Sequence, residues 1–152
     1  MDRIRVAPLS PTRLLEAATV VAHALYPDGW SEEQGAFCAR SLERQMAIDG
    51  FDTLFAEQAG ALVGFAFVNW GFSIRKGAPF AHIQLLYTLP EQRRSGVARQ
   101  LLRAVRQLAE EHSACRVELE TDTENFAART LYESCGFEWL TNKEVYMLFF
   151  DR

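Results

Sequence analysis

The hydrophobic positions of the chain recur at three- and four-residue steps in four separate stretches. This spacing predicts amphipathic helices over about 12–26, 31–48, 96–111 and 124–134. Ser10 and Pro11 precede the first stretch as an N-cap and a first-turn proline, and Ser31 with Gln34 forms a capping-box pattern before the second. We therefore expect four helices, with the clearest start signal at Ser31.

Between these stretches the chain shows the alternation or the continuous apolar runs of strands. The predicted strands cover about 4–8, 52–58, 62–70, 81–89, 115–121, 137–140 and 144–150. Ala59-Gly60 separates two of them, which predicts an antiparallel hairpin, and the second strand of that hairpin is apolar on both faces, as an interior strand is. The order of elements predicts a single α/β domain over residues 1–152, with mixed strand directions.

Composition and charge narrow the function classes. The chain has 152 residues, of which 49% are hydrophobic and 24% charged, and a net charge of −4 without a basic stripe. Nucleic acid and membrane surfaces are therefore not expected as partners. The start of the chain lacks the apolar core of a signal peptide, and no apolar run reaches the length of a membrane span, so we expect a cytoplasmic protein.

The cysteines predict neither a disulfide nor a metal site. They are three in number and widely spaced, at Cys38, Cys115 and Cys135. We interpret each as a small buried hydrophobic residue and expect no metal.

The stretch RRSGVARQLL, from Arg93 to Leu102, is the first candidate for chemistry. A strand ending at Pro90 is followed by a basic loop with one glycine and then by a helix, whose first N–H groups form a natural phosphate site. Gly96 would let an anion approach the backbone, and the two arginines would add charge. The alternative, a turn glycine beside solvated arginines, is equally favoured by this stretch alone. The pattern fits neither the dinucleotide fingerprint nor the P-loop.

Two motifs together resemble the GNAT superfamily of N-acetyltransferases. RRSGVA is similar to the family's Q/R-x-x-G-x-G/A pyrophosphate loop, with Arg93, Gly96 and Ala98 at the defined positions. NFAARTLYESCGF is similar to its N-x-x-A-x-x-L-Y-x-x-x-G-F segment, with Asn125 and Tyr132 among the matches. The resemblance covers about residues 81–137 and implies a GNAT-like α/β (α+β) fold, with a mixed, mostly antiparallel sheet of about six to seven strands and about four helices.

The resemblance also implies a donor and its site. Acetyl-CoA would be the cosubstrate, its pyrophosphate wrapped by the loop and its pantetheine arm held along the preceding strand, with Asn125 nearby. The residues implied are Leu86, Tyr87 and Thr88 on the strand and Arg93, Arg94, Ser95, Gly96, Val97 and Ala98 in the loop. Thr88 stands where the family commonly has valine.

Transfer to an amine needs a base for the nitrogen and an acid for the leaving thiolate. The resemblance assigns the acid to Tyr132, against the simpler interpretation of a packed core aromatic. The carboxylate that many relatives carry on the strand is replaced here by Gln84 and Leu85. His82, two residues from Gln84 and expected on the same strand face, is one candidate base.

Glu118 and Glu120, on one face of the next strand, are the other candidate bases. The remaining alternative is that no side chain is the base and that bulk water accepts the proton from an acceptor amine with a lower pKa. We do not expect a covalent enzyme intermediate, because no cysteine has a sequence neighbour that would activate it. Direct attack in a ternary complex is the predicted route.

Three functions follow from this sequence. The first is an N-acetyltransferase acting on a primary amine of a small molecule, and the second acetylates a protein N-terminus or lysine. The third is a catalytically weak module that senses acyl-CoA, and the missing strand carboxylate is the reason to retain this alternative. An unrelated phosphate-binding domain is the least favoured function. The apolar run VYMLFF would be buried in the subunit or at a homodimer interface.

Overall fold

The computed structural model describes residues 3–151, which divide into two compact units between Glu120 and Thr121. The first unit contains five strands: β1 (Arg5–Pro8), β2 (Phe51–Gln58), β3 (Ala61–Ser73), β4 (Ala78–Thr88) and β5 (Val117–Leu119). Its helices are the 3₁₀ turns η1 (Pro11–Arg13) and η2 (Pro90–Gln92) and the α-helices α1 (Leu14–Leu25), α2 (Glu32–Met46) and α3 (Val97–Glu111). The second unit contains α4 (Phe126–Ser134).

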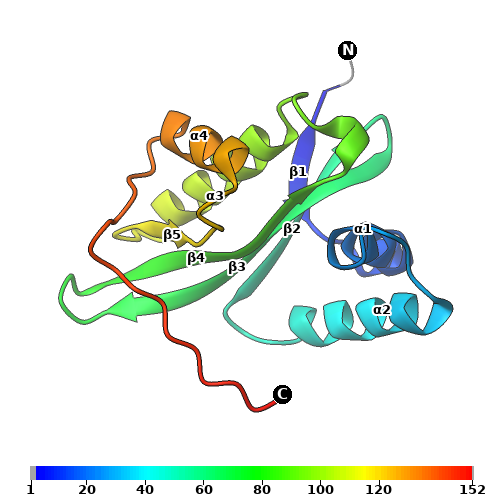
Figure 1. The fold of residues 1–152 in the computed structure, drawn as a ribbon, viewed down its shortest axis with the longest axis horizontal. Helices are drawn as coiled ribbons and strands as arrows, with labels where there is room; N and C mark the ends of the chain where they lie inside the picture. The colour runs from blue at the N-terminus through cyan, green and yellow to red at the C-terminus, as the bar shows by residue number, and fades with distance from the viewer. Residues whose placement is uncertain (1–2, 152) are drawn as a thin grey trace. The chain divides into compact units, whose positions relative to one another are not determined.

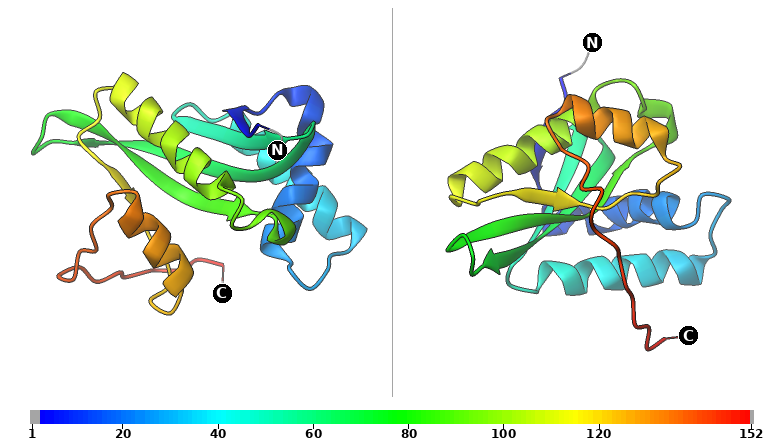
Figure 2. Two further views of the ribbon diagram at one scale, coloured as in Figure 1. Left: turned by 90° about the horizontal axis from the view of Figure 1, so that it is seen from above. Right: turned by 60° about the vertical axis from the view of Figure 1, so that its left-hand side comes forward.

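The five strands form one sheet in the order β1-β2-β3-β4-β5. The first four are antiparallel neighbours, and β5 pairs with β4 in parallel. Helices α1 and α2 lie on one face of this sheet and α3 lies on the other (Figures 1 and 2). The α/β class, the mixed sheet and the four α-helices agree with the sequence-based prediction, but the strands are fewer than the six to seven expected.

The two faces of the sheet have different cores. Phe55, Phe65 and Phe67 pack with the buried alanines and valines of α1 and with Cys38 and Leu42 of α2. On the other face, the apolar stripe of α3 is buried, as the spacing predicted. Cys115 is exposed and Cys135 half-buried, so the prediction of three buried cysteines holds only for Cys38. Cys115 lies before β5 begins, because that strand is shorter than the predicted 115–121.

Local capping signals were read correctly at one helix and wrongly at another. The Ser31 side chain accepts a hydrogen bond from the Gln34 amide, and the Gln34 side chain accepts one from the Ser31 amide, so the capping box is formed. Ser10 makes no cap; its hydroxyl contacts that of Thr12 at 2.9 Å, and a 3₁₀ turn precedes α1.

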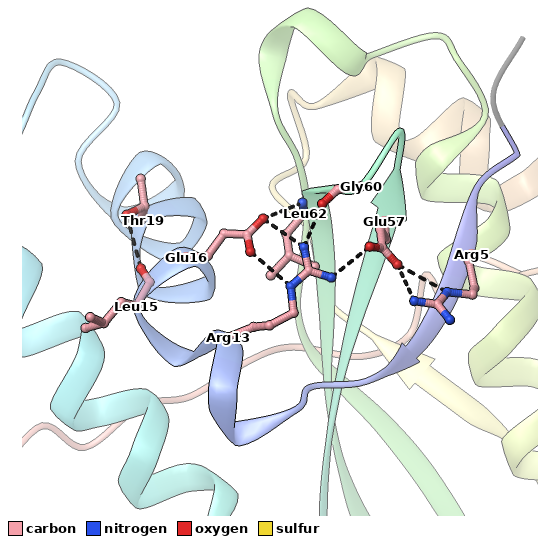
Figure 3. Close-up of polar contacts among 8 residues, drawn as sticks. All are labelled: Arg5, Arg13, Leu15, Glu16, Thr19, Glu57, Gly60 and Leu62. Atoms are coloured by element: carbon pink, nitrogen blue, oxygen red, sulfur yellow. Dashed lines mark hydrogen bonds and ion pairs between the residues drawn. The ribbon is translucent and has the colours of Figure 1, made fainter.

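A charged network ties the β2–β3 hairpin to β1 and to the start of α1 (Figure 3). The Arg13 guanidinium donates to Glu16, to Glu57 at 2.8 Å and to the Gly60 carbonyl at 2.9 Å. Glu57 also pairs with Arg5, and the Glu16 carboxylate accepts from the Leu62 amide. The turn itself has Ala59 and Gly60 at positive φ (52° and 80°), which is the geometry of a type I′ hairpin turn.

In the second unit, the two predicted closing strands are absent from residues 137–151. A strand exists only where its backbone groups find a ladder partner, and the described part of this unit offers one helix and no strand. The apolar side chains of the predicted last strand remain exposed: Tyr146, Leu148 and Phe150 by 82–93%. The prediction of strands at 137–140 and 144–150 is therefore wrong.

Candidate functional site

The loop between β4 and α3 has a strained backbone. Gly96, the N-cap of α3, adopts φ +90°, and Arg94 also lies in the left-handed region at φ +65°. A Cβ on Gly96 would meet no atom within 4 Å, so the glycine faces open space. The conformation explains why glycine stands here, because side-chain-bearing residues adopt this φ at a cost.

The first turn of α3 presents its amides to that open space. The N–H groups of Val97 and Ala98 precede the first intrahelical hydrogen bond, which runs from Gln100 N to Gly96 O at 3.0 Å. As a glycine N-cap, Gly96 offers no side-chain oxygen to these amides. The helix dipole adds a partial positive charge at the same point, so the turn suits an anionic ligand.

The loop is braced from within. The Ser95 hydroxyl donates to the Gln92 carbonyl, and Arg93 Nε donates to the Thr88 carbonyl at 3.3 Å. The Arg93 guanidinium also lies 5.8 Å from the centre of the Tyr87 ring. Arg93 therefore holds the loop against the end of β4, a role that the sequence did not predict.

Strand β4 leaves β5 before it reaches the loop. The two strands pair only from Ala81 to Ile83, although β4 continues to Thr88. From Gln84 onward, the edge of β4 that faces away from β3 has no ladder partner within the described chain. The Thr88 hydroxyl, buried close to the loop, has no hydrogen-bond partner either. The free backbone groups of β4 thus lie on the predicted path of the pantetheine arm, while the Thr88 hydroxyl is buried.

A β-bulge lies at the position of the missing carboxylate. The β3–β4 register passes from Phe67↔Leu85 to Val68↔Ile83, which leaves Gln84 without a partner. The bulge shifts the alternation, so the register places Leu85 on the strand face of His82, and the face of Gln84 stays a prediction.

His82 on β4 belongs to a small polar cluster with one residue of β3 and one just after β5. Its Nδ1 lies 2.9 Å from Asn69 Oδ1 on β3, and its Nε2 lies 3.6 Å from a carboxylate oxygen of Glu120, just after β5. The register places Glu118 beside His82, but the Glu118 carboxylate pairs with Arg116 at 3.0 Å. The structure thus joins His82 to Glu120 rather than to Glu118.

Asn69 was missed by the sequence analysis. A single asparagine in an apolar strand has no motif, and its contact with His82 depends on the β3–β4 register, where the two residues are direct partners. Asn69 therefore enters the candidate site from the structure alone.

The second motif lies in the second unit. Asn125 is the N-cap of α4, and its side chain accepts a hydrogen bond from the Ala128 amide at 3.2 Å. Burial raises the pKa of the Tyr132 phenol, and its ring lies 5.9 Å from that of Phe137. A phenol with a raised pKa stays protonated at neutral pH, as a proton donor must.

Other features of the described residues lie apart from these groups. A cavity of about 680 Å³ is bordered by β1, the β2–β3 turn and α3, and none of the predicted site residues lines it. Among residues 3–151 there is no group of three metal-ligating side chains, and no helix there is both long and apolar enough to cross a membrane.

The family model and the curated relatives that match this chain are all acetyltransferases. Residues 15–137 match the model of the acetyltransferase (GNAT) family. A mycothiol acetyltransferase of Thermobispora bispora is 30% identical over 90% of this chain, which spans only 47% of that relative. An aminoglycoside N(6')-acetyltransferase type 1 of Serratia marcescens is 27% identical over 81% of this chain and 84% of its own length.

A solved structure shares the fold. Aminoglycoside N-acetyltransferase AAC(6')-Iy in complex with CoA superimposes with a TM-score of 0.79, over 97% of this chain and 96% of that one, at 20% identity.

Proposed function

Since the chain belongs to the acetyltransferase (GNAT) family, we propose that it moves an acetyl group from acetyl-CoA to a primary amine of a small molecule. The observation that carries this proposal is the glycine-capped first turn of α3, which opens beside the unpaired end of β4. A phosphate-bearing thioester with a long amide-containing arm needs both features.

The residues fit the donor. The amides of Ser95, Gly96, Val97 and Ala98 would hold the pyrophosphate, and Arg94, exposed at the loop, would add charge. The free edge of β4 over Leu86, Tyr87 and Thr88 would hydrogen-bond the pantetheine amides. Asn125 stays a prediction from its motif. Bound acetyl-CoA supplies the activated acyl group.

The chain's own side chains would then move the protons. An alkylammonium has a pKa of about 10.4, so only about one molecule in a thousand is neutral at pH 7, and a base speeds the reaction. We assign this role to His82, because its side chain is partly exposed and its Nδ1 contacts Asn69, which leaves Nε2 for the acceptor. Tyr132 would donate to the leaving sulfur, and the amine attacks directly in a ternary complex.

The small-molecule acceptor is favoured by the names of two relatives, a mycothiol and an aminoglycoside acetyltransferase. Acetylation of a protein or peptide and an acyl-CoA sensor are the alternative functions. Within the proposal, residues 1–152 work as one domain in the cytoplasm, and a homodimer would cover the exposed apolar side chains near the C-terminus.

The test is thiol release from acetyl-CoA by the purified protein, across aminoglycosides, polyamines, amino acids, mycothiol-type amino sugars and short peptides. Release that depends on one small amine establishes the transferase and its acceptor class. Release with peptides alone would establish the protein-acetylating alternative. Acetyl-CoA binding without release from any amine would support the sensor.

A further inference from the structure

The contacts around His82 decide which of its two nitrogens can act as a base. Nδ1 lies 2.9 Å from Asn69 Oδ1, and an amide oxygen only accepts hydrogen bonds. The Nδ1 atom must therefore carry the proton. In the neutral ring the lone pair is then on Nε2, the nitrogen that lies near Glu120.

Glu120 lies beside the His82 ring, which becomes positively charged when Nε2 takes up a proton. Its carboxylate oxygen is 3.6 Å from Nε2, beyond a direct hydrogen bond and well within the range of an ion pair. The Glu120 side chain is 64% exposed and the His82 side chain 25% exposed, so solvent reaches both groups. The neighbouring charges, those of Arg116 just before β5 and Glu118 on β5, already pair with each other.

We infer that Asn69 is a positioning residue for the proposed reaction: it fixes the His82 tautomer with its proton on Nδ1 and so makes Nε2 the base. Nε2 accepts the proton that the acceptor nitrogen loses, the Glu120 carboxylate stabilises the resulting imidazolium, and the proton then passes to solvent. This inference rests on the proposed function for its catalytic consequence, whereas the tautomer is a property of the protein alone.

The tautomer can be read directly. Long-range ¹H–¹⁵N NMR of histidine-labelled protein, at a pH of about 9 where an ordinary imidazole is neutral, distinguishes Nδ1–H from Nε2–H. We expect Nδ1–H at His82 in the wild type and in Asn69→Asp, which keeps an acceptor oxygen, and a mixture or Nε2–H in Asn69→Leu. His112, whose Nδ1 lies 2.9 Å from the Leu108 carbonyl, is the internal control and should not change.

Kinetics with the responsive amine supply the second readout. We expect Asn69→Leu to lower kcat by about tenfold or more with the KM for acetyl-CoA unchanged, and Asn69→Asp to recover most of the loss. Glu120→Gln should lower kcat without altering the tautomer. If Asn69→Leu does not fold, Asn69→Ala replaces it.

The two proposals fail in different ways. Wild-type His82 in the Nε2–H form, or an unchanged tautomer in Asn69→Leu, overturns the role of Asn69 even if the protein is an active transferase. A protein that releases no thiol with any amine contradicts the proposed function, while the NMR result still decides the tautomer.

Discussion

At the scale of single residues, the phenol of Tyr132 should act in the chemical step. Burial raises its pKa, so the hydroxyl keeps its proton at neutral pH and can give it to a leaving thiolate. We expect Tyr132→Phe to lower kcat by about 10²-fold and to leave the KM for acetyl-CoA nearly unchanged. Steady-state kinetics with Tyr146→Phe as the control provide the measurement, because Tyr146 is 90% exposed in the same unit. An unchanged turnover number in Tyr132→Phe would remove the proposed role.

Residues differ in how much of their role the sequence reveals. Gly96 was predicted to be a glycine at the start of a helix, and it is the N-cap of α3 with φ +90°. This position could be predicted because the motif and the conformation involve the same few residues. Asn69 and the bulge at Gln84 depend on pairing between β3 and β4, which the order of residues along one strand does not contain. The polar neighbours of His82 could therefore not be identified before the sheet register was known.

At the scale of elements, Gly64 joins the sheet to the first turn of α3. A Cβ at this position would lie 2.6 Å from the Tyr87 carbonyl oxygen and 3.1 Å from Val97 Cγ1. Gly64→Ala must therefore displace β4 or α3 just where the donor is expected to bind. Overpacking of this kind costs about 1–3 kcal/mol, or several degrees in Tm, and we also expect the KM for acetyl-CoA to rise severalfold.

Gly35→Ala is the matched control for Gly64→Ala. Gly35 lies in α2, and its added Cβ would make an ordinary 3.5 Å contact with the Trp30 ring. Because alanine is a better helix former by about 1 kcal/mol, Gly35→Ala should keep or raise Tm without changing donor binding. Thermal unfolding and initial rates compare the two variants; equal Tm values would show that α3 does not depend on close approach at Gly64.

Elements with local signals were predicted well, and those that need a distant partner were not. The capping box at Ser31 and the turn at Ala59-Gly60 formed as the sequence predicted, since the residues concerned are within four positions of each other. The segments 137–140 and 144–150 have strand-like composition, but composition supplies no ladder partner, and no strand forms there in the described chain.

At the scale of the whole molecule, one carboxylate links three parts of the first unit. Glu57 on β2 accepts from Arg5 of β1 and from Arg13 before α1, and these two hydrogen bonds hold its pKa below the ordinary value of 4.5 (Figure 3). The charged Glu57 carboxylate therefore adds its full contribution to the stability of the folded unit above pH 4.5. This contribution is lost as pH falls through the lowered pKa of Glu57 in the folded state. Acid should weaken the connection between β1, the hairpin and α1.

Glu57→Gln tests this linkage through the pH dependence of unfolding. At pH 7 we expect the variant to melt a few degrees below the wild type, because Arg5 loses its carboxylate partner and Arg13 keeps Glu16 as its one carboxylate partner among those described. The difference in Tm should shrink as pH falls below 4.5, since the unfolded chain then binds a proton at Glu57 and the folded wild type loses the charge as pH passes its lowered pKa. Glu110→Gln, which breaks one exposed pair with Arg106 on α3, is the control and should follow the wild type at every pH. A Tm difference between Glu57→Gln and the wild type that stays constant from pH 7 to pH 3 would mean that the Glu57 side chain stabilises the unit by its shape rather than its charge.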